Sequence, residues 1–340
     1  MPTIFDVAQA AGVGVGTVSR VLNDSPAVSD ATRSKVQAVI SDLDYRPSSL
    51  ARGLSLGTTN IIGAVVPKVT RPSSMERLRG VLDELGGSGY DLALYQVDGE
   101  EQRSSRIRDI VRPDRCSAGL LISLRAAPDE ILVMTQAKRP VVTIDGHIEG
   151  LPGCHIDNVA GGRMATEHLL RLGHRVIAFV GDIEDDLGFN PGAARFEGYQ
   201  EALRGLGIAR RDDLIKTGPH SRESADELTR GLFGASDPPT GIVATSDTQA
   251  FGVMAAVRSQ GLEVPTDVSV VGFDDLELAG HLGLTTVRQP LYESGVLGAR
   301  MLLQQLDGHR DGLDVVELPL EVVVRETTAP PSKGSALYGA

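Results

Sequence analysis

Apolar residues in the first 45 positions of the chain repeat at the spacing of short helices. One stripe consists of Val7, Ala8 and Ala11. Gly12 follows this stripe directly and suits the left-handed turn that ends a helix. Thr3 precedes it with Asp6 three residues later, the spacing of a weak capping box. The pattern predicts a first helix that begins after Thr3 and ends at Gly12.

A second apolar stripe predicts another short helix and consists of Val18, Val21 and Leu22. The other face of this helix is small, polar and singly basic: Val15, Gly16, Thr17, Ser19, Arg20 and Asn23. Hydroxyl and amide groups suit phosphate oxygens, and an arginine fork suits a guanine edge. A third helix is predicted from Ser29, with inward-facing Val36, Val39, Ile40 and Leu43. Three such helices around one small core are typical of a helix-turn-helix module, and a generic three-helix interaction module is the alternative.

From residue 60 onward the pattern becomes α/β. Short β-rich runs alternate with amphipathic helical segments, first through NIIGAVVP, DLALYQV, AGLLIS and RPVVTID. A second series of runs follows: VIAFVGD, DLIKTG, TGIVAT and VSVVGFDD. Strand–helix alternation predicts parallel sheets with helices on both faces, and two series predict two lobes. In such sheets a ligand binds at the carboxyl ends of the strands, which places the candidate site in the cleft between the lobes.

Charged side chains stand at several of these predicted strand ends. Asp145 ends VVTID, Asp274 follows VVGF, and Arg195 opens a helix after a loop. A carboxylate accepts hydroxyl hydrogen bonds and an arginine fork donates several, which suits the recognition of a polyol. The alternative is that a strand-end carboxylate only caps a helix. For Asp157, Asp247 and Asp275 both interpretations remain open.

Motifs that suggest enzymatic chemistry fail on their structural context. GVGVG at residues 12–16 has Thr17 where a dinucleotide loop needs its last glycine, and a helix precedes it instead of a strand. Residues 53–57 match G-x-S-x-G, but the order of helix and strand is reversed. His168, His174 and the acidic run 182–186 offer no converging metal ligands, so they indicate helix-surface residues and a solvated loop. We expect no enzyme, cofactor or metal site.

Composition agrees with a cytoplasmic protein that has real cores. The 340 residues are 41% hydrophobic, without an apolar run of membrane-spanning length or an export signal. Cys116 and Cys154 make neither a disulfide framework nor a zinc site. Residues 1–60 hold five basic and five acidic residues, so the net charge of −12 lies entirely in the rest of the chain. This charge disfavours indiscriminate DNA contact by the body.

The helical start of the chain resembles a known family. DVAQAAGVGVGTVSRVLND, VSDATRSKV and LDYRPSSLARGL are similar to the DNA-binding headpiece and hinge of the LacI/GalR transcriptional repressors. The resemblance continues to about residue 330 through IDN…HLLRLGHR, SVVGFDD and LTTVRQP. It implies an all-α helix-turn-helix headpiece ahead of a two-lobed, periplasmic-binding-protein-like α/β body whose chain crosses three times between lobes.

On this resemblance the chain divides into four parts. Residues 1–46 form the headpiece, 47–59 a hinge helix or linker, 60–330 the body, and 331–340 a disordered tail. The N-lobe comprises about 60–157 and 288–319, and the C-lobe about 158–287 and 320–330. The hinge is too short to be helical alone, so it would fold only against a partner; a flexible linker is the alternative.

The resemblance implies DNA contacts from the headpiece and the hinge: Thr3, Val15, Gly16, Thr17, Ser19, Arg20, Asn23, Ser29, Thr32, Tyr45, Ser48, Ala51, Leu54 and Ser55. In the family a hinge leucine wedges into the minor groove and kinks the duplex, and Leu54 matches it. Gly14 lacks the usual capping hydroxyl, Gly16 has no side chain, and Val15 offers only apolar contact. We therefore expect Arg20 to carry most of the direct base readout.

The resemblance also implies effector contacts from Asp145, Arg195, Ser246 and Asp274, with Ser73, Ser74, His220 and Gln289 as neighbours. Ser246-Asp247 stands where many relatives have Asn-Asp, which replaces an amide contact by a hydroxyl. His220 stands where an aromatic platform is common, so it either stacks on a sugar face or is solvated. The effector class implied is a sugar.

These observations favour a repressor that binds a palindromic operator as a dimer under control of a small-molecule effector. The alternative is a sugar-binding protein without DNA-binding function, which would carry an export signal in place of the headpiece. The segment after Arg325 is rich in Pro, Ser and Gly and lacks leucine heptads, so we expect a homodimer that does not assemble further.

Overall fold

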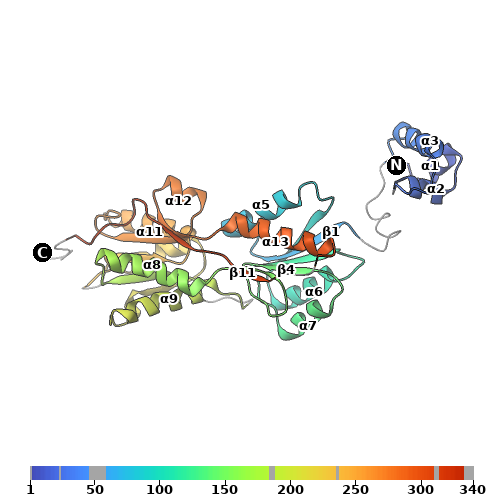
Figure 1. Cartoon of the computed structure of the whole chain (residues 1–340). Helices are drawn as coiled ribbons and strands as arrows, with labels where there is room; N and C mark the ends of the chain where they lie inside the picture. The colour runs from blue at the N-terminus through green and yellow to red at the C-terminus, as the bar shows by residue number, and fades with distance from the viewer. Residues whose placement is uncertain are drawn as a thin grey trace. The chain divides into compact units, whose positions relative to one another are not determined.

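The protein consists of two compact units, residues 1–60 and 61–340 (Figure 1). A computed structural model describes residues 2–22, 24–45, 59–183, 188–234, 237–309 and 314–332. Residues 47–58 of the predicted hinge, the G-x-S-x-G run and most of the predicted tail lie outside these ranges. Pro331 and Ser332, which we expected in the tail, belong to the described fold, because Ser332 Oγ donates to the Thr266 carbonyl at 2.8 Å. No helix in these ranges is long and apolar enough to span a bilayer.

The headpiece contains the three predicted helices, α1 (Ile4–Ala11), α2 (Val15–Leu22) and α3 (Asp30–Asp42). The capping box of α1 is present: the Thr3 amide donates to Asp6 Oδ2 at 2.7 Å, and the Asp6 amide donates to Thr3 Oγ1 at 3.4 Å. Gly12 has the left-handed φ of 62° that ends α1. The shared core consists of Val7, Ala8, Ala11, Val18, Val21 and Val36. This small core joins all three helices, as the apolar spacing predicted.

The first sheet of the body, which with its helices we call the N-lobe, has strand order β11-β5-β4-β3-β1-β2. Its strands are β1 (Ile61–Pro67), β2 (Asp91–Val97), β3 (Ala118–Ile122), β4 (Val141–Ile144), β5 (Gly153–His155) and β11 (Val315–Glu317). All of its strand pairs are parallel. Helices α5 (Pro72–Leu85), α6 (Glu100–Ile110), α7 (Pro128–Gln136) and α13 (Leu291–Leu306) complete it.

Alternate residues of β1 build the cores on the two faces of this sheet. Ile62, Ala64 and Val66 pack in the cluster that includes side chains of α5 and α13. Val65 packs in the other cluster, with side chains of α6 and α7. Because successive side chains of a strand point to opposite faces, both faces of the sheet are covered by helices.

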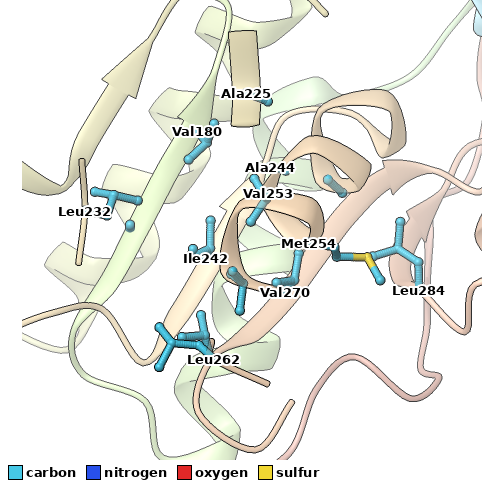
Figure 2. Close-up of a cluster of buried hydrophobic side chains, with 14 of the residues drawn as sticks. Val180, Ala225, Leu232, Ile242, Ala244, Val253, Met254, Leu262, Val270 and Leu284 are labelled. Carbon is cyan, nitrogen blue, oxygen red and sulfur yellow. The ribbon is translucent and has the colours of Figure 1, made fainter. Parts of the chain in front are cut away.

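The second sheet, which with its helices we call the C-lobe, has strand order β12-β10-β9-β8-β6-β7. Its strands are β6 (Ile177–Gly181), β7 (Ile215–Thr217), β8 (Gly241–Ala244), β9 (Ser269–Asp274), β10 (Thr285–Arg288) and the antiparallel β12 (Glu321–Val323). Its helices are α8 (Asn158–Leu172), α9 (Pro191–Gly205), α10 (Arg222–Arg230), α11 (Asp247–Ser259), α12 (Glu277–His281) and the 3₁₀ turn Asp212–Leu214. Figure 2 shows one of its cores, in which Ile242 and Val270 pack with Val253 and Met254 of α11.

The chain passes between the two sheets three times. It leaves β5 for α8, returns from β10 to α13, and leaves β11 for β12. The three connections and the parallel sheets confirm the two-lobed, periplasmic-binding-protein-like class. They also bring the carboxyl ends of strands in the two lobes toward one space.

Candidate functional site

A cavity opens at the carboxyl ends of strands from both lobes. Pro67 ends β1, Asp145 follows β4 and Asp274 ends β9, and all three line the same space. The volume of the cavity is about 620 Å³, including the part that is open to solvent. Side chains of both lobes therefore line one space.

All eight residues that we predicted to contact an effector line this cavity: Ser73, Ser74, Asp145, Arg195, His220, Ser246, Asp274 and Gln289. Their roles toward a ligand remain predictions. Other side chains that line the cavity were not predicted from the sequence, among them Arg71, Arg77, Ser123, Asp182, Phe189 and Thr245. A signal for Arg77 exists in the sequence, because it stands four and three residues after Ser73 and Ser74 and therefore on the same helix face.

On the N-lobe side, Asp145 and Arg77 form a buried ion pair. Arg77 Nη2 lies 2.9 Å from Asp145 Oδ2 and donates to Gln289 Oε1 at 2.8 Å. Ser123 Oγ donates to the same carboxylate oxygen at 2.7 Å. Asp145 has a left-handed φ of 58°, a conformation that aspartate tolerates better than most residues. The contacts fix Asp145 at the strand end and leave its other oxygen for a ligand.

On the C-lobe side, Arg195 is held at three points. Its Nε donates to Asn158 Oδ1 at 2.9 Å, and its Nη1 donates to the Thr245 carbonyl at 2.6 Å. The guanidinium lies 3.5 Å from the centroid of the Phe273 ring, a cation–π contact. Asp274 Oδ1 is 3.9 Å from Nη1, and burial raises the pKa of this carboxyl while the charge of Arg195 opposes the rise. Asp274 lines the cavity, and its φ of 121° is uncommon for a residue other than glycine.

Asp182 corrects our interpretation of the acidic run as a solvated loop. Its carboxylate lines the cavity, lies 3.4 Å from Arg71 Nη2 and accepts from Thr245 Oγ1 at 3.3 Å. Residues 184–186 of the run lie outside the described ranges.

His220 lies beside the pair of Arg71 and Asp182. Burial and, to a smaller extent, the charge of Arg71 lower the pKa of His220 to about 4. His220 is therefore a neutral, half-buried imidazole at the cavity, with donor and acceptor nitrogens.

For three strand-end carboxylates, a ligand contact and a structural role had both remained open, and the structure shows structural contacts for all three. Asp157 caps α8, accepting from the Ala160 amide at 2.9 Å. The buried Asp247 accepts from the Leu276 amide at 2.8 Å and from Thr286 Oγ1 at 2.6 Å. Asp275 pairs with Arg288 and Arg325 at 2.7 and 2.6 Å. None of the three lines the cavity. Ser246 has both features, since it lines the cavity and also caps α11 through the Gln249 amide at 3.2 Å.

The histidines of HLLRLGHR are buried, which corrects our expectation of surface positions. His168 Nε2 lies 3.0 Å from Thr328 Oγ1. His174 Nδ1 lies 2.9 Å from Thr240 Oγ1, and its Nε2 donates to the Ala329 carbonyl at 2.9 Å. They attach the C-terminal segment to the C-lobe. Within the described ranges, no group of three or more His, Cys, Asp or Glu could hold a metal ion.

These histidines predict a loss of stability in mild acid. Burial lowers the pKa of both His168 and His174 below the ordinary value of 6.5, so the unfolded chain takes up protons first. Their contribution is therefore complete above about pH 6.5 and is lost as the pH falls below it, at up to about 1.4 kcal/mol per pH unit for each histidine. Urea unfolding at pH 5 to 8 measures this slope. Replacing both by glutamine should flatten it, whereas His281→Gln, at an exposed position, should not.

The headpiece presents a second candidate surface on α2. Arg20 and Gly16 are exposed, and Thr17 and Ser19 are half-buried. Val15 is half-buried and packs against the headpiece core, so only part of it is open to contact. The hydroxyls of Thr3 and Ser29 already serve the helix caps of α1 and α3.

The remaining predicted DNA contacts are partly half-buried and partly outside the residues that the structure describes. Thr32 and Tyr45 are half-buried, and Thr32 Oγ1 lies 3.0 Å from Ser29 Oγ. Five lie outside the described residues: Asn23, Ser48, Ala51, Leu54 and Ser55. All fourteen remain predictions as DNA contacts, and Arg20 is the exposed cation on α2.

Comparison with known proteins identifies both units. Residues 3–48 match the model of bacterial regulatory proteins of the lacI family, and residues 166–328 match the periplasmic binding protein-like domain. The ribose operon repressor of Halalkalibacterium halodurans is 34% identical over 333 residues, which cover 96% of this chain and 97% of that protein. The chain belongs to the lacI family of bacterial regulatory proteins.

Solved structures of the lacI family agree over almost the whole length. The lac repressor dimer bound to operator and the anti-inducer ONPF superposes with a TM-score of 0.83 at 26% identity, covering 96% of this chain and 99% of that one. The complex of the transcriptional regulator CelR with cellobiose is 31% identical with a TM-score of 0.68, covering 96% and 100%. This lacI-family chain is a transcriptional regulator, and the comparisons support the absence of an enzymatic function.

Proposed function

We propose that this lacI-family protein is a repressor that binds a palindromic operator as a homodimer in the cytoplasm and responds to a sugar-type effector bound in the cavity. The observation that carries the proposal is the cavity itself, which joins side chains of both lobes in one space. A ligand there favours one arrangement of the lobes over another, because it contacts both at once. We also propose the domain boundaries expected from the sequence, with the linker near residues 47–59.

The headpiece supports DNA binding through α2. Val18 and Val21 bury one side of this helix in the core, which leaves Arg20 exposed on the other. A related protein, the lac repressor, has been solved on its operator as a dimer. A single headpiece with equal numbers of acidic and basic residues gives weak binding, so two half-sites are needed for affinity.

The cavity supports a hydroxyl-bearing effector. Asp145 and Asp274 offer carboxylate oxygens, Ser73 and Ser74 offer hydroxyls, and Arg195 offers a guanidinium. These groups bind the hydroxyls of a polyol from several directions. The CelR relative has been solved with cellobiose.

Exposed apolar side chains support a homodimer. Met75 and Leu82 of α5 are 53% and 55% exposed. Leu278 of α12 is 50% exposed, and Leu282, which directly follows α12, is 40% exposed. Both helices lie along the same side of the body (Figure 1). Large apolar side chains gathered on one side of a protein mark an interaction surface. We assign this side to a second copy of the chain.

Negative charge introduced by substitution on this side of the body should dissociate the dimer. We expect Leu82→Glu combined with Leu278→Glu to give a monomer in light scattering at micromolar concentration, because each buried carboxylate loses its hydration without gaining a partner. Operator affinity should fall as the dimer dissociates, while effector affinity should stay within about twofold of the wild-type value. Leu132→Glu is the matched control, because Leu132 is 55% exposed on α7, which covers the other face of the N-lobe sheet. A double variant that stays dimeric would contradict the assignment.

The test of the function as a whole uses the full chain. Selection from random duplexes should return a palindromic site, and fluorescence anisotropy should then show that a compound from a panel of sugars and related metabolites changes the affinity for it. Selection of no sequence, together with tight sugar binding, would instead support a sugar-binding protein without DNA-binding function.

A further inference from the structure

The cavity holds an excess of cationic side chains over carboxylates. It is lined by Lys68, Arg71, Arg77 and Arg195, and by Asp145, Asp182 and Asp274. The body as a whole has the opposite balance, since it carries the net charge of −12. Three arginines in one small site are more than the hydroxyl groups of a neutral sugar require. The local charge is therefore a property of the cavity and not of the surrounding surface.

Arg77 is the most buried of these cations and is incompletely satisfied. Its side chain is 3% exposed, and its contacts are those to Asp145, to Gln289 and, at 3.4 Å, to the Ser73 carbonyl. A guanidinium has five N–H donors, and the Nε donor of Arg77 has no acceptor among the described residues. A buried polar group without a partner is costly, so a further acceptor near this guanidinium would stabilise it.

Arg195 has room for another acceptor as well. Its distance of 3.9 Å to Asp274 is too long for a hydrogen bond, although the two charges attract. The bonds of Arg195 that the structure describes run from Nε and Nη1, so its Nη2 is available to a ligand. The carboxylate of Asp274 is instead engaged by the side chain of Gln289 at 2.5 Å.

The start of α5 adds a third favourable element for an anion. This helix has 14 residues, its N-cap residue Arg71 makes no side-chain cap, and Pro72 occupies the first turn. Ser73 and Ser74 of that turn line the cavity, where the positive end of the helix dipole favours negative charge. The guanidinium of Arg77 reaches back to the Ser73 carbonyl, so the unsatisfied cation and the uncapped helix start adjoin.

We propose that the effector is an acidic sugar, with a carboxylate or phosphate group bound between the first turn of α5 and Arg77. Arg195 then holds the ligand from the C-lobe, and Asp145 and Asp274 accept its hydroxyl groups. The anion holds the ligand on the N-lobe and the hydroxyls reach both lobes, so the ligand as a whole couples binding to the arrangement of the lobes. This inference rests on the proposed effector role of the cavity.

Matched ligand pairs test the charge of the effector on the full-length protein. Titration calorimetry would compare D-glucose with D-glucuronate, D-galactose with D-galacturonate, and D-ribose with D-ribose 5-phosphate. We expect the acidic member of at least one pair to bind at least tenfold more tightly than its neutral partner, and the pairs tell carboxylate from phosphate. Neutral members that bind as tightly or more tightly, or a neutral compound that binds when all three acids fail, would overturn the inference and leave the proposed function intact. If no compound binds or alters operator affinity, the proposed function itself fails.

Arg77 variants test the location of the anion. Arg77→Met should reduce the ratio of acidic to neutral affinity by about 10- to 100-fold, because a charge-assisted hydrogen bond is lost. Arg79→Met is the matched control, since Arg79 lies on the same helix with a 58% exposed side chain paired to Glu76. Arg77→Lys keeps a charge beside Asp145 and should retain part of the preference even if Arg77→Met folds poorly. An unchanged ratio in both Arg77 variants would overturn the assigned location.

Discussion

Replacing Arg20 by alanine is expected to abolish specific operator binding at physiological salt while leaving effector binding unchanged. Arg20 is exposed on α2, and the preceding turn of the helix carries Gly16, which has no side chain. One bidentate arginine–guanine contact contributes about 1–3 kcal/mol of discrimination. A dimer loses two such contacts, so we expect a loss of at least about 30-fold. Fluorescence anisotropy with the selected operator and with a scrambled duplex measures this loss.

Two further headpiece variants separate base readout from charge. Lys35→Ala removes one positive charge from the exposed side of α3 and should weaken both duplexes slightly and equally. Arg20→Lys keeps the charge but not the planar fork, so it should retain binding to the scrambled duplex and lose the preference for the operator. Equal losses for Arg20→Ala and Lys35→Ala, with the preference preserved, would contradict a base-reading role for Arg20.

The parts of the fold that the sequence predicted are those with local signals. The helices of the headpiece carry their own caps and apolar stripes, and the eight predicted strands are β-rich runs flanked by turn residues. Strands β5, β11 and β12 have only three residues each, and β10 has four. β11 and β12 pair with strands far away in the chain, as when Val315 of β11 pairs with Gly153. A pattern read along the chain cannot show such non-local pairing.

The candidate site likewise contains residues that the sequence could predict and residues whose contacts it could not show. Asp145 and Asp274 could be placed from the sequence because the carboxyl ends of parallel strands meet at one edge of a sheet. The contact of Arg77 with Asp145 depends on how α5 packs against that sheet, and Asp182 belongs to a run whose charge suggested a solvated loop. His168 and His174 are buried only because residues 328–329 return to the C-lobe. Each of these three errors concerns a contact between distant segments.

Arg195 is the residue whose loss should most strongly separate effector response from folding. Helices α8 and α9 pack closely at Arg195: a Cβ on Gly162 of α8 would lie only 2.0 Å from the Arg195 carbonyl oxygen. The Arg195 side chain joins Asn158, Thr245 and the Phe273 ring. We expect Arg195→Met to remove the effector response at ligand concentrations up to 100-fold above the wild-type requirement. It should also destabilise the body by about 3 kcal/mol, because Asp274 keeps a buried charge without its partner.

The effect on folding can be reversed without restoring the ligand contact. Asp274→Asn removes the uncompensated charge, so the double variant Arg195→Met/Asp274→Asn should recover most of the urea midpoint that Arg195→Met loses, since neutral replacements of a buried pair are tolerated. The double variant should still bind the operator, because the headpiece is unchanged, and it should fail to respond to effector. Recovery of the response together with the stability would show that Arg195 acts only by holding the C-lobe together, and that the ligand does not contact its guanidinium.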